Sequence, residues 1–342
     1  MKKVSSKTVY VAMSGGVDSS VAAALLKKRG FKVVGVFMRP WQDISASCLW
    51  QQDREDAMRV ATQLDIPLLT WDFSKDYGRK VTKYMIDAYR RGITPNPDVM
   101  CNKEIKFGLF FKRAIKEGAD FIATGHYART KNGKLLMAVD VNKDQTYFLW
   151  TLTSDILKKT IFPIGVYTKP EVRKLAKRFN LPNFNKKDSQ GVCFIGPLDM
   201  REFLKHKIKP KTGKIVHLDG RTLGSHDGAY YYTIGQRHGL DIKLGGGPYY
   251  IVRKDIKKNI IYIGNKNDLN QSFARVRGLR WVDKTKILTN IDVKIRYRTA
   301  SRRALLIKDG KIIFQKPQRA VTPGQSAVFY KGKQLLGGGI IV

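Results

Sequence analysis

The feature that most constrains the fold lies near the N-terminus, where an apolar run leads into a loop of serines and glycines and then into a helix. Residues 9–13 (VYVAM) are typical of a buried strand, residues 14–20 read SGGVDSS, and residues 21–28 are helical in pattern. Such a junction gathers free backbone N–H groups and the positive end of a helix dipole, and Gly15 and Gly16 let the backbone approach a ligand closely. The loop is therefore predicted to bind phosphate groups, with hydroxyl donors from Ser14, Ser19 and Ser20.

Asp18 is an unusual residue for an anion-binding loop, and we expect it to hold a magnesium ion or to cap the loop. No Gly-Lys-Ser/Thr follows the loop, so it is not a Walker A motif, and the chain has no G-x-G-x-x-G motif. A different kind of nucleotide loop is indicated.

Short apolar runs alternate with helical patterns over the first 140 residues. Because these runs are apolar on both faces, they predict an open parallel sheet covered by helices. The predicted strands are 8–13, 32–38, 68–73 and 120–124.

Three further residues lie at the carboxyl ends of predicted strands, where ligands bind in open α/β folds. Met38 is expected to flank an adenine, and Gly125 is expected to permit close approach of a ribose or base. For His126 two interpretations stay open, a substrate contact and a packed or capping residue.

Beyond residue 205 the pattern changes to short β-type runs with turn signals. We predict an α/β domain over 1–205 that carries the nucleotide loop, a small β-rich central domain over 206–270 with strands at 229–233, 249–253 and 260–263, and a C-terminal antiparallel β-barrel over 271–342. Asp219-Gly220 and Asp309-Gly310 predict hairpin turns, and Thr168-Lys169-Pro170-Glu171 predicts a helix start with a capping box.

The chain has 64 lysines and arginines against 28 acidic residues, a formal charge of +36. A polyanion is the partner that best explains this excess, and nucleic acid is favoured because each neutralised phosphate releases counterions. A lysine-rich composition bias is the alternative. A membrane surface is not favoured, since no basic amphipathic helix stands out.

No signal sequence or long apolar segment is found in the sequence, so we expect a cytoplasmic protein with reduced cysteines. The run that follows Lys2 and Lys3 is too short for a signal peptide.

Cys101 comes just before an apolar-periodic helix that contains Ile105, Leu109 and Phe110. A thiol at a helix N-terminus has a lowered pKa, so Cys101 is predicted to be nucleophilic. Asp98, three residues earlier, is expected to be a general acid or base, or else the N-cap of the helix.

Cys193 lies in a glycine-bounded segment that follows Lys186 and Lys187, a setting that suits a thiol charged with sulfur elsewhere and then brought to the site. Cys48 is expected to be structural. No C-x-x-C motif is present, although Asp98, Cys101 and Cys193 together leave a three-ligand iron-sulfur site open.

Basic residues alternate along two predicted strands of the last domain. Lys294, Arg296 and Arg298 would face one side, as would Arg275 and Arg277. Such rows suit a phosphate backbone.

Seven segments, read together, resemble the tRNA-specific 2-thiouridylase family of the PP-loop ATP pyrophosphatases. The resemblance runs nearly from end to end, and the layout of that family agrees with the three predicted domains. The segments are SGGVDSS, NPDVMCNKEIKFG, ATGHYAR, KDQTYFLW, KKDSQGVCFIG, YTIGQRHGL and PGQSAVFY.

This resemblance implies that ATP adenylylates the C2 oxygen of the wobble uridine and that a persulfide on Cys193 delivers sulfur to C2. Cys101 would be its nucleophilic partner, and the two would end as a disulfide that a thiol reductant reopens, with a persulfide carrier protein as donor. ATP would contact Ala12, Met13, Ser14, Gly15, Gly16, Val17, Asp18, Ser19, Met38 and Gly125. The tRNA would contact Asn96, Pro97, Asp98, His126, Lys143, Asp144, Gln145, Arg296, Tyr297 and Gln325.

Two alternatives stay open. One is another adenylating PP-loop enzyme, such as a tRNA lysidine synthetase or an amidotransferase-type synthetase, neither of which needs two reactive cysteines. The other is a basic RNA-binding protein with a degenerate nucleotide site, against which the intact loop counts.

Overall fold

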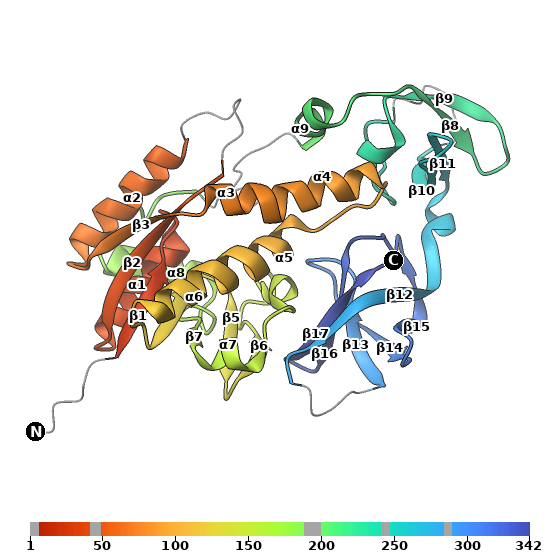
Figure 1. Ribbon diagram of the computed structural model, residues 1–342. Helices are drawn as coiled ribbons and strands as arrows, with labels where there is room; N and C mark the ends of the chain where they lie inside the picture. The colour runs from red at the N-terminus through yellow and green to blue at the C-terminus, as the bar shows by residue number, and fades with distance from the viewer. Residues whose placement is uncertain (1–6, 42–48, 188–199, 241, 243–246, 284–288) are drawn as a thin grey trace, which may run out of the picture.

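The computed structural model describes residues 7–41, 49–187, 200–240, 242, 247–283 and 289–342. Figure 1 shows a parallel sheet with its helices at one end of the molecule and a β-barrel at the other, with the central β-rich module above the barrel. The predicted fold class, an open parallel-sheet domain followed by two β-rich parts, is confirmed.

The parallel sheet has five strands in the order β3-β2-β1-β4-β7. β1 is central, with Val11 opposite Gly35 on one side and Ala123 on the other. All four predicted strands are present, and only the two-residue β7 was missed, because so short a strand leaves no pattern. The strands are β1 (Thr8–Ala12), β2 (Lys32–Arg39), β3 (Leu68–Asp72), β4 (Phe121–Thr124) and β7 (Thr160–Ile161).

Side chains of β1 alternate between two apolar clusters, one on each face of the sheet. Val9 and Val11 pack with α1 (Val17–Lys28), α2 (Leu49–Gln63) and α8 (Lys169–Arg178). Tyr10 and Ala12 share the other cluster with a long helical segment made of α5 (Pro97–Cys101), the π-helical η2 (Asn102–Phe110) and α6 (Phe111–Lys116). Burial on both faces explains why the strands are apolar throughout.

The start of α8 is fixed by a capping box. The predicted capping box is confirmed at α8, where the Glu171 carboxylate accepts a hydrogen bond from the Thr168 backbone N–H at 2.7 Å. Elsewhere the helices are α3 (Ser74–Tyr77), η1 (Gly78–Thr82), α4 (Lys83–Arg90), η3 (Thr146–Leu149), α7 (Ser154–Lys158), α9 (Met200–Lys207), η4 (Ala229–Tyr231) and η5 (Lys266–Leu269).

The central module is a four-stranded sheet in the order β10-β11-β8-β9. The strands are β8 (Gly213–His217), β9 (Thr222–His226), β10 (Tyr250–Asp255) and β11 (Ile260–Gly264), and Asp219-Gly220 forms the predicted β8–β9 turn.

One predicted strand of the central module was wrong, since 229–233 begins with the 3₁₀ turn η4. Tertiary contacts override the β-type pattern there. The hydroxyls of Tyr230 and Tyr231 donate to backbone carbonyls of Lys209 and Ile208, just after α9, and the Ala229 N–H donates to Asn259.

The C-terminal part is a closed antiparallel barrel, as predicted. Its six strands follow the order β12-β15-β14-β13-β16-β17, and β17 pairs back onto β12, with Val276 opposite Ile341. The strands are β12 (Asn270–Trp281), β13 (Asn290–Lys294), β14 (Arg302–Leu306), β15 (Lys311–Arg319), β16 (Ser326–Lys331) and β17 (Gln334–Ile341).

A hairpin from the first part of the chain extends the barrel sheet. It is formed by β5 (Ala128–Lys131) and β6 (Lys134–Met137), and β6 pairs with β17, with Leu135 opposite Leu335. Both leucines are fully buried in the cluster that also covers one face of the parallel sheet. The two ends of the chain therefore share one core, and the predicted domain limits at 205 and 270 stay predictions.

This shared core predicts a difference between two adjacent leucines of β6. Leu135→Ala leaves a cavity and is expected to lower the free energy of unfolding by about 2–5 kcal/mol. Leu136→Ala, on the half-buried face, is the matched control with a smaller loss. Urea denaturation followed by fluorescence measures both, and equal losses would contradict the shared core.

Candidate active site

The serine-glycine loop lies between the carboxyl end of β1 and the amino end of α1, as predicted. Gly15 has a φ of 74°, and a Cβ there would lie 2.1 Å from the carbonyl oxygen of Asp53. No other residue fits this position without strain. Gly16 is the N-cap of α1 and gives no side-chain hydrogen bond, so the cap leaves the first-turn N–H groups to a ligand.

Two of the three loop hydroxyls point inward rather than toward a ligand. Ser19 and Ser20 both donate to the Gly16 carbonyl, at 3.0 and 2.9 Å, and the Ser14 N–H donates to Ser19. This corrects the expectation that all three serines offer hydroxyl donors to phosphate. Ser14 is the exposed member of the set.

Asp18 neither caps the loop nor stands alone. Its Oδ1 accepts hydrogen bonds from the Lys169 ammonium at 2.8 Å and from the Tyr127 hydroxyl at 3.0 Å. Asn183, which is 6% exposed, donates from its amide nitrogen to the Gly15 carbonyl at 2.9 Å. The loop is thus held by side chains distant in the sequence.

Met38 and Gly125 lie at the carboxyl ends of their strands, as predicted, and Gly125 also has a packing role. A Cβ at Gly125 would lie 2.6 Å from the backbone nitrogen of Ser19. Gly125 is therefore required for packing against the start of α1, and its place beside a ribose or base stays a prediction. Met38 is buried in the sheet cluster at the end of β2.

His126 is a packed residue in this structure. It is 7% exposed, its ring lies near those of Phe107 and Phe162, and Nδ1 is 2.8 Å from the Thr124 hydroxyl. Burial, with a smaller contribution from Lys106, holds the pKa of His126 well below its ordinary value, so the ring is neutral at neutral pH.

The segment before Cys101 begins the long helix of the sheet domain. Asn96, not Asp98, is the N-cap, because its side-chain oxygen accepts from the Val99 N–H at 3.2 Å, and Pro97 is the first helical residue. Asp98 lies in the first turn.

The end of the barrel lies against this helix start. The side chain of Gln325 donates to the backbone carbonyls of Thr94 and Pro95, at 2.9 and 3.2 Å. Asn96 lines a cavity of about 190 Å³ between α5 and the barrel, together with Lys103 of the helix and Arg280 of β12. A predicted tRNA contact thus borders an interdomain cavity with two cationic side chains.

Cys101 is fully buried, in the cluster that also contains Ile105 and Ala12. The expected setting near a helix N-terminus is present, since Cys101 is the fifth residue of the helix. Lys103, two residues after Cys101, forms an ion pair with Glu104 at 2.9 Å. Cys193 and Cys48 lie outside the described residues.

The segment 143–145 lies between the hairpin strand β6 and the 3₁₀ helix η3. Asp144 is buried and accepts from the Ala138 N–H at 2.9 Å and the Thr146 hydroxyl at 2.8 Å, and burial raises its pKa. Gln145 accepts from the Tyr127 N–H at 2.9 Å. Lys143 is half-buried. Asp144 and Gln145 therefore connect this segment to residues 127, 138 and 146 by hydrogen bonds.

The predicted basic row at 294–298 is wrong, whereas that at 275 and 277 is confirmed. β13 ends at Lys294, which is 8% exposed and lies 3.8 Å from Asp144. A turn follows, in which Arg298 has a φ of 61°. Because the chain turns after β13, the side chains of Lys294, Arg296 and Arg298 do not face one side of a strand. Arg275 and Arg277 both face outward from β12.

Arg296 and Tyr297 occupy this turn. Arg296 donates to the Ala320 carbonyl at 2.9 Å, and burial lowers its pKa. The Tyr297 ring packs on Phe148, with 4.4 Å between ring centroids. Both predicted tRNA contacts thus lie where the barrel meets the sheet domain.

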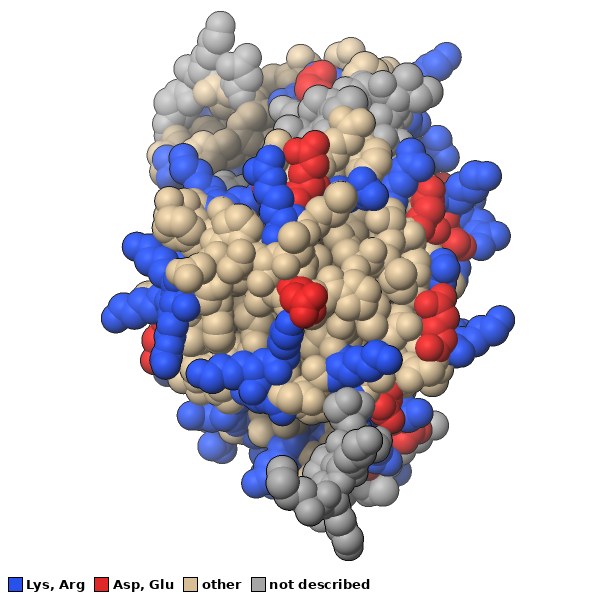
Figure 2. Space-filling view, turned by 90° about the vertical axis from the view of Figure 1, so that its left-hand side faces the viewer, with Lys and Arg blue, Asp and Glu red and all other residues tan. Residues whose placement is uncertain are grey.

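Figure 2 shows lysines and arginines around the rim of one face, with a largely uncharged centre. Within the described ranges, no group of three His, Cys, Asp or Glu side chains could hold a metal ion, and no helix is long and apolar enough to cross a membrane.

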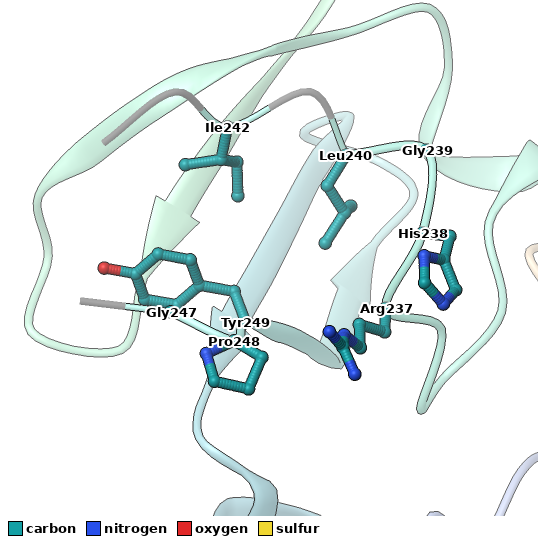
Figure 3. Close-up of a pocket in the computed structure, with 8 residues that line it drawn as sticks. All are labelled: Arg237, His238, Gly239, Leu240, Ile242, Gly247, Pro248 and Tyr249. Carbon is teal, nitrogen blue, oxygen red and sulfur yellow. The ribbon is translucent and has the colours of Figure 1, made fainter. Parts of the chain in front are cut away.

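A cavity of about 320 Å³ lies in the central module, apart from the predicted site residues. In Figure 3 Leu240, Ile242 and Tyr249 line one part of it and Arg237 and His238 another.

Lys169, Tyr127 and Asn183 were missed by sequence reasoning. Lys169 was noticed only as part of a helix cap, and nothing local indicates that it contacts a loop 151 residues away. The unusual Asp18 was the available signal, because a carboxylate beside a phosphate site needs a cation nearby.

Family models match three consecutive parts of the chain. They are described as a tRNA methyl transferase HUP domain over residues 7–197, a tRNA methyl transferase PRC-barrel domain over 201–265, and an aminomethyltransferase beta-barrel domain over 272–341. Among solved structures, the U34-tRNA thiolase NcsA from Methanococcus maripaludis is 19% identical, with a TM-score of 0.38 over 59% of this chain and 67% of that one.

Curated relatives match over nearly the whole length. The tRNA-specific 2-thiouridylase MnmA of Oceanobacillus iheyensis is 47% identical, covering 100% of this chain and 96% of that protein. The protein of the same name from Bacillus subtilis is 45% identical, covering 99% and 96%. With such identity over its full length, the chain belongs to the tRNA-specific 2-thiouridylase family.

Proposed function

We propose that this chain uses ATP to replace the C2 oxygen of the wobble uridine of a tRNA with sulfur, in the cytoplasm. The observation that carries the proposal is the SGGVDSS loop, held open at the N-terminus of α1, in a chain that is 47% identical over its full length to a curated 2-thiouridylase. Lysidine synthetases and amidotransferase-type synthetases share such a loop but do not need Cys101 and Cys193.

The loop would bind ATP through the N–H groups at the start of α1, with Ala12 to Ser19, Met38 and Gly125 around the nucleotide. The C2 oxygen of uracil is a poor leaving group. Attack of this oxygen on the α-phosphorus, with loss of pyrophosphate, converts it into part of a good leaving group, AMP.

Sulfur would come from a persulfide on Cys193, charged by a carrier protein. The outer sulfur bonds to C2 as AMP leaves, and the Cys101 thiolate then attacks the inner sulfur. The sulfur-sulfur bond breaks toward the uridine, which leaves 2-thiouridine and a Cys101–Cys193 disulfide. A thiol reductant supplies the two electrons that reopen it.

The burial of Cys101 sets a condition on this chemistry. A fully buried thiol meets neither a persulfide nor a uridine, so the residues that cover it must move when tRNA binds. The barrel contacts the segment before this helix through Gln325. A tRNA that binds the barrel could therefore shift the start of the helix and expose the Cys101 thiol.

A magnesium ion would be held by Asp18 together with the phosphates of ATP. Magnesium is usually bound by one or two carboxylates plus substrate phosphates, and the Asp18 carboxylate is 31% exposed beside the loop. When bound, the ion would neutralise charge on the departing pyrophosphate.

The tRNA would lie across the junction of helix and barrel. The resemblance assigns Asn96, Pro97 and Asp98 to the target base, and the cavity beside Asn96, with Lys103 and Arg280, supports this position. The other residues that the resemblance assigns to the tRNA are His126, Lys143, Asp144, Gln145, Arg296, Tyr297 and Gln325. Of these, His126 and Asp144 are buried and would hold the neighbouring loops in place rather than contact the tRNA.

The function is tested by incubating the protein with ATP, tRNA and a persulfide donor. AMP release and 2-thiouridine are measured by chromatography and nucleoside mass spectrometry. We expect Cys101→Ser and Cys193→Ser each to abolish 2-thiouridine while tRNA binding survives, because both thiols take part in sulfur transfer. Cys48→Ser is the matched control and should keep activity. Formation of 2-thiouridine by Cys101→Ser or Cys193→Ser would refute the proposed sulfur transfer between the two cysteines. Absence of AMP with the wild-type protein would refute the proposed ATP-dependent activity.

The tRNA interface is tested at Arg296. Arg296→Ala should weaken tRNA binding and make its salt dependence shallower by about one counterion. Arg303, an exposed arginine of β14 paired with Asp292, is the control. Filter binding over a salt series gives both slopes. An unchanged slope for Arg296→Ala would mean that its hydrogen bond to Ala320 is purely structural.

A further inference from the structure

The barrel strand β12 contains a β-bulge that changes which of its side chains face outward. Arg277 lies opposite Ile340 of β17. Arg280 lies opposite Gly338, so the pairing advances by three residues on β12 but by only two on β17. Gly278, within the bulge, has a φ of 64°, a conformation that favours glycine. The glycine between the two arginines therefore explains where the strand takes up its extra residue.

The bulge reverses the alternation of side chains along β12. The residues that pack in or against the barrel core are even-numbered before the bulge and odd-numbered after it; they are Ala274, Val276, Leu279 and Trp281. Since successive side chains of a strand point to opposite faces, Arg277 and Arg280 both point outward, and both are exposed. In a regular strand, two residues three positions apart would face opposite sides.

The two arginines are close neighbours on the outer face of the barrel. Their partners on β17 are two residues apart, which corresponds to about 7 Å along the strand. This is similar to the spacing of successive phosphates along an RNA strand. Among the described residues neither arginine has an ion-pair partner, whereas Arg275, the preceding arginine on this face, pairs with Asp309 at 3.4 Å.

This face of the bulge lies at the junction with the sheet domain. On β17, Ile340 packs against the cluster that covers one face of the parallel sheet. A Cβ at Gly338 would lie 3.0 Å from the ring of Trp150, just after η3. Arg280 lines the cavity of about 190 Å³ that Asn96 also lines. The bulge thus places a cationic side chain at the cavity beside the start of the Cys101 helix.

We propose that Arg277 and Arg280 bind two successive phosphates of the tRNA beside the target uridine, an inference that rests on the proposed function. Guanidinium groups bind phosphates through paired N–H donors, and each neutralised phosphate releases counterions. With the RNA backbone held on the barrel face, the cavity beside Asn96 is left for the base. The two arginines position the RNA and take no part in sulfur transfer.

The first test measures binding of an anticodon stem-loop RNA over a salt series. Arg277→Ala and Arg280→Ala should each weaken binding by about tenfold and reduce the slope of log K against log salt by about 0.7. Arg277→Lys and Arg280→Lys should keep most of the slope, because the charge remains. Arg303→Ala, at an exposed arginine of β14, is the matched control and should leave the slope unchanged.

The second test identifies the phosphates that the arginines contact. Single phosphates beside the target uridine are replaced by uncharged methylphosphonates in the same RNA. If Arg280 binds one of these phosphates, its replacement weakens binding to the wild-type protein but adds no loss for Arg280→Ala. Arg277→Ala should behave in the same way at the neighbouring phosphate. Losses that add at every position, or unchanged salt slopes in both alanine variants, would overturn the proposal.

An assay of 2-thiouridine formation separates the remaining outcomes. Both alanine variants should have a raised KM for tRNA and a nearly unchanged kcat, because only binding is affected. Loss of thiolation with a persulfide carrier protein, at unchanged RNA binding, would mean that these arginines bind a protein, and it would also overturn the proposal. A wild-type protein that forms no 2-thiouridine would instead overturn the proposed function, so the two failures are distinguishable.

Discussion

The parallel pairing of β1 with β2 on one side and β4 on the other fixes where the groups of the proposed nucleotide site lie. All three strands end at one edge, which brings the loop after Ala12, Met38 and Gly125 together. Gly125, just after β4, packs directly against the backbone of Ser19 at the start of α1, with no room for a side chain. A side chain at that glycine would displace the loop, so the geometry of the phosphate site depends on the sheet beneath it.

The sheet domain and the barrel are joined next to this site by strand pairing and by a shared apolar cluster. The β5–β6 hairpin leaves the sheet directly after Gly125 and His126 and adds to the barrel through β17. Tyr127, at the start of the hairpin, donates to Asp18 of the loop. The barrel is therefore connected to the phosphate loop through the hairpin and Tyr127, and to the start of the Cys101 helix through Gln325. A tRNA bound across the barrel would act on both connections.

Local features were predictable from the sequence because local physics determines them. The strands of the parallel sheet, the capping box of α8 and the turns at Asp219 and Asp309 each depend on neighbouring residues. Contacts between distant segments were not predictable in the same way. The burial of Lys294, the 3₁₀ turn at Ala229 and the Lys169–Asp18 pair are all set by packing of parts far apart in the chain. The site residues of the phosphate loop were found from their motif, whereas the side chains that hold the loop were not.

The central claim is that the loop activates the C2 oxygen of a uridine as an adenylate, so that sulfur replaces that oxygen. The most direct measurement uses tRNA whose wobble uridine carries oxygen-18 at C2, with ATP and a persulfide donor, followed by mass spectrometry of the nucleotide products. The account predicts that each 2-thiouridine formed is matched by one AMP whose phosphate carries oxygen-18. Unlabelled AMP, with oxygen-18 released into water, would contradict it.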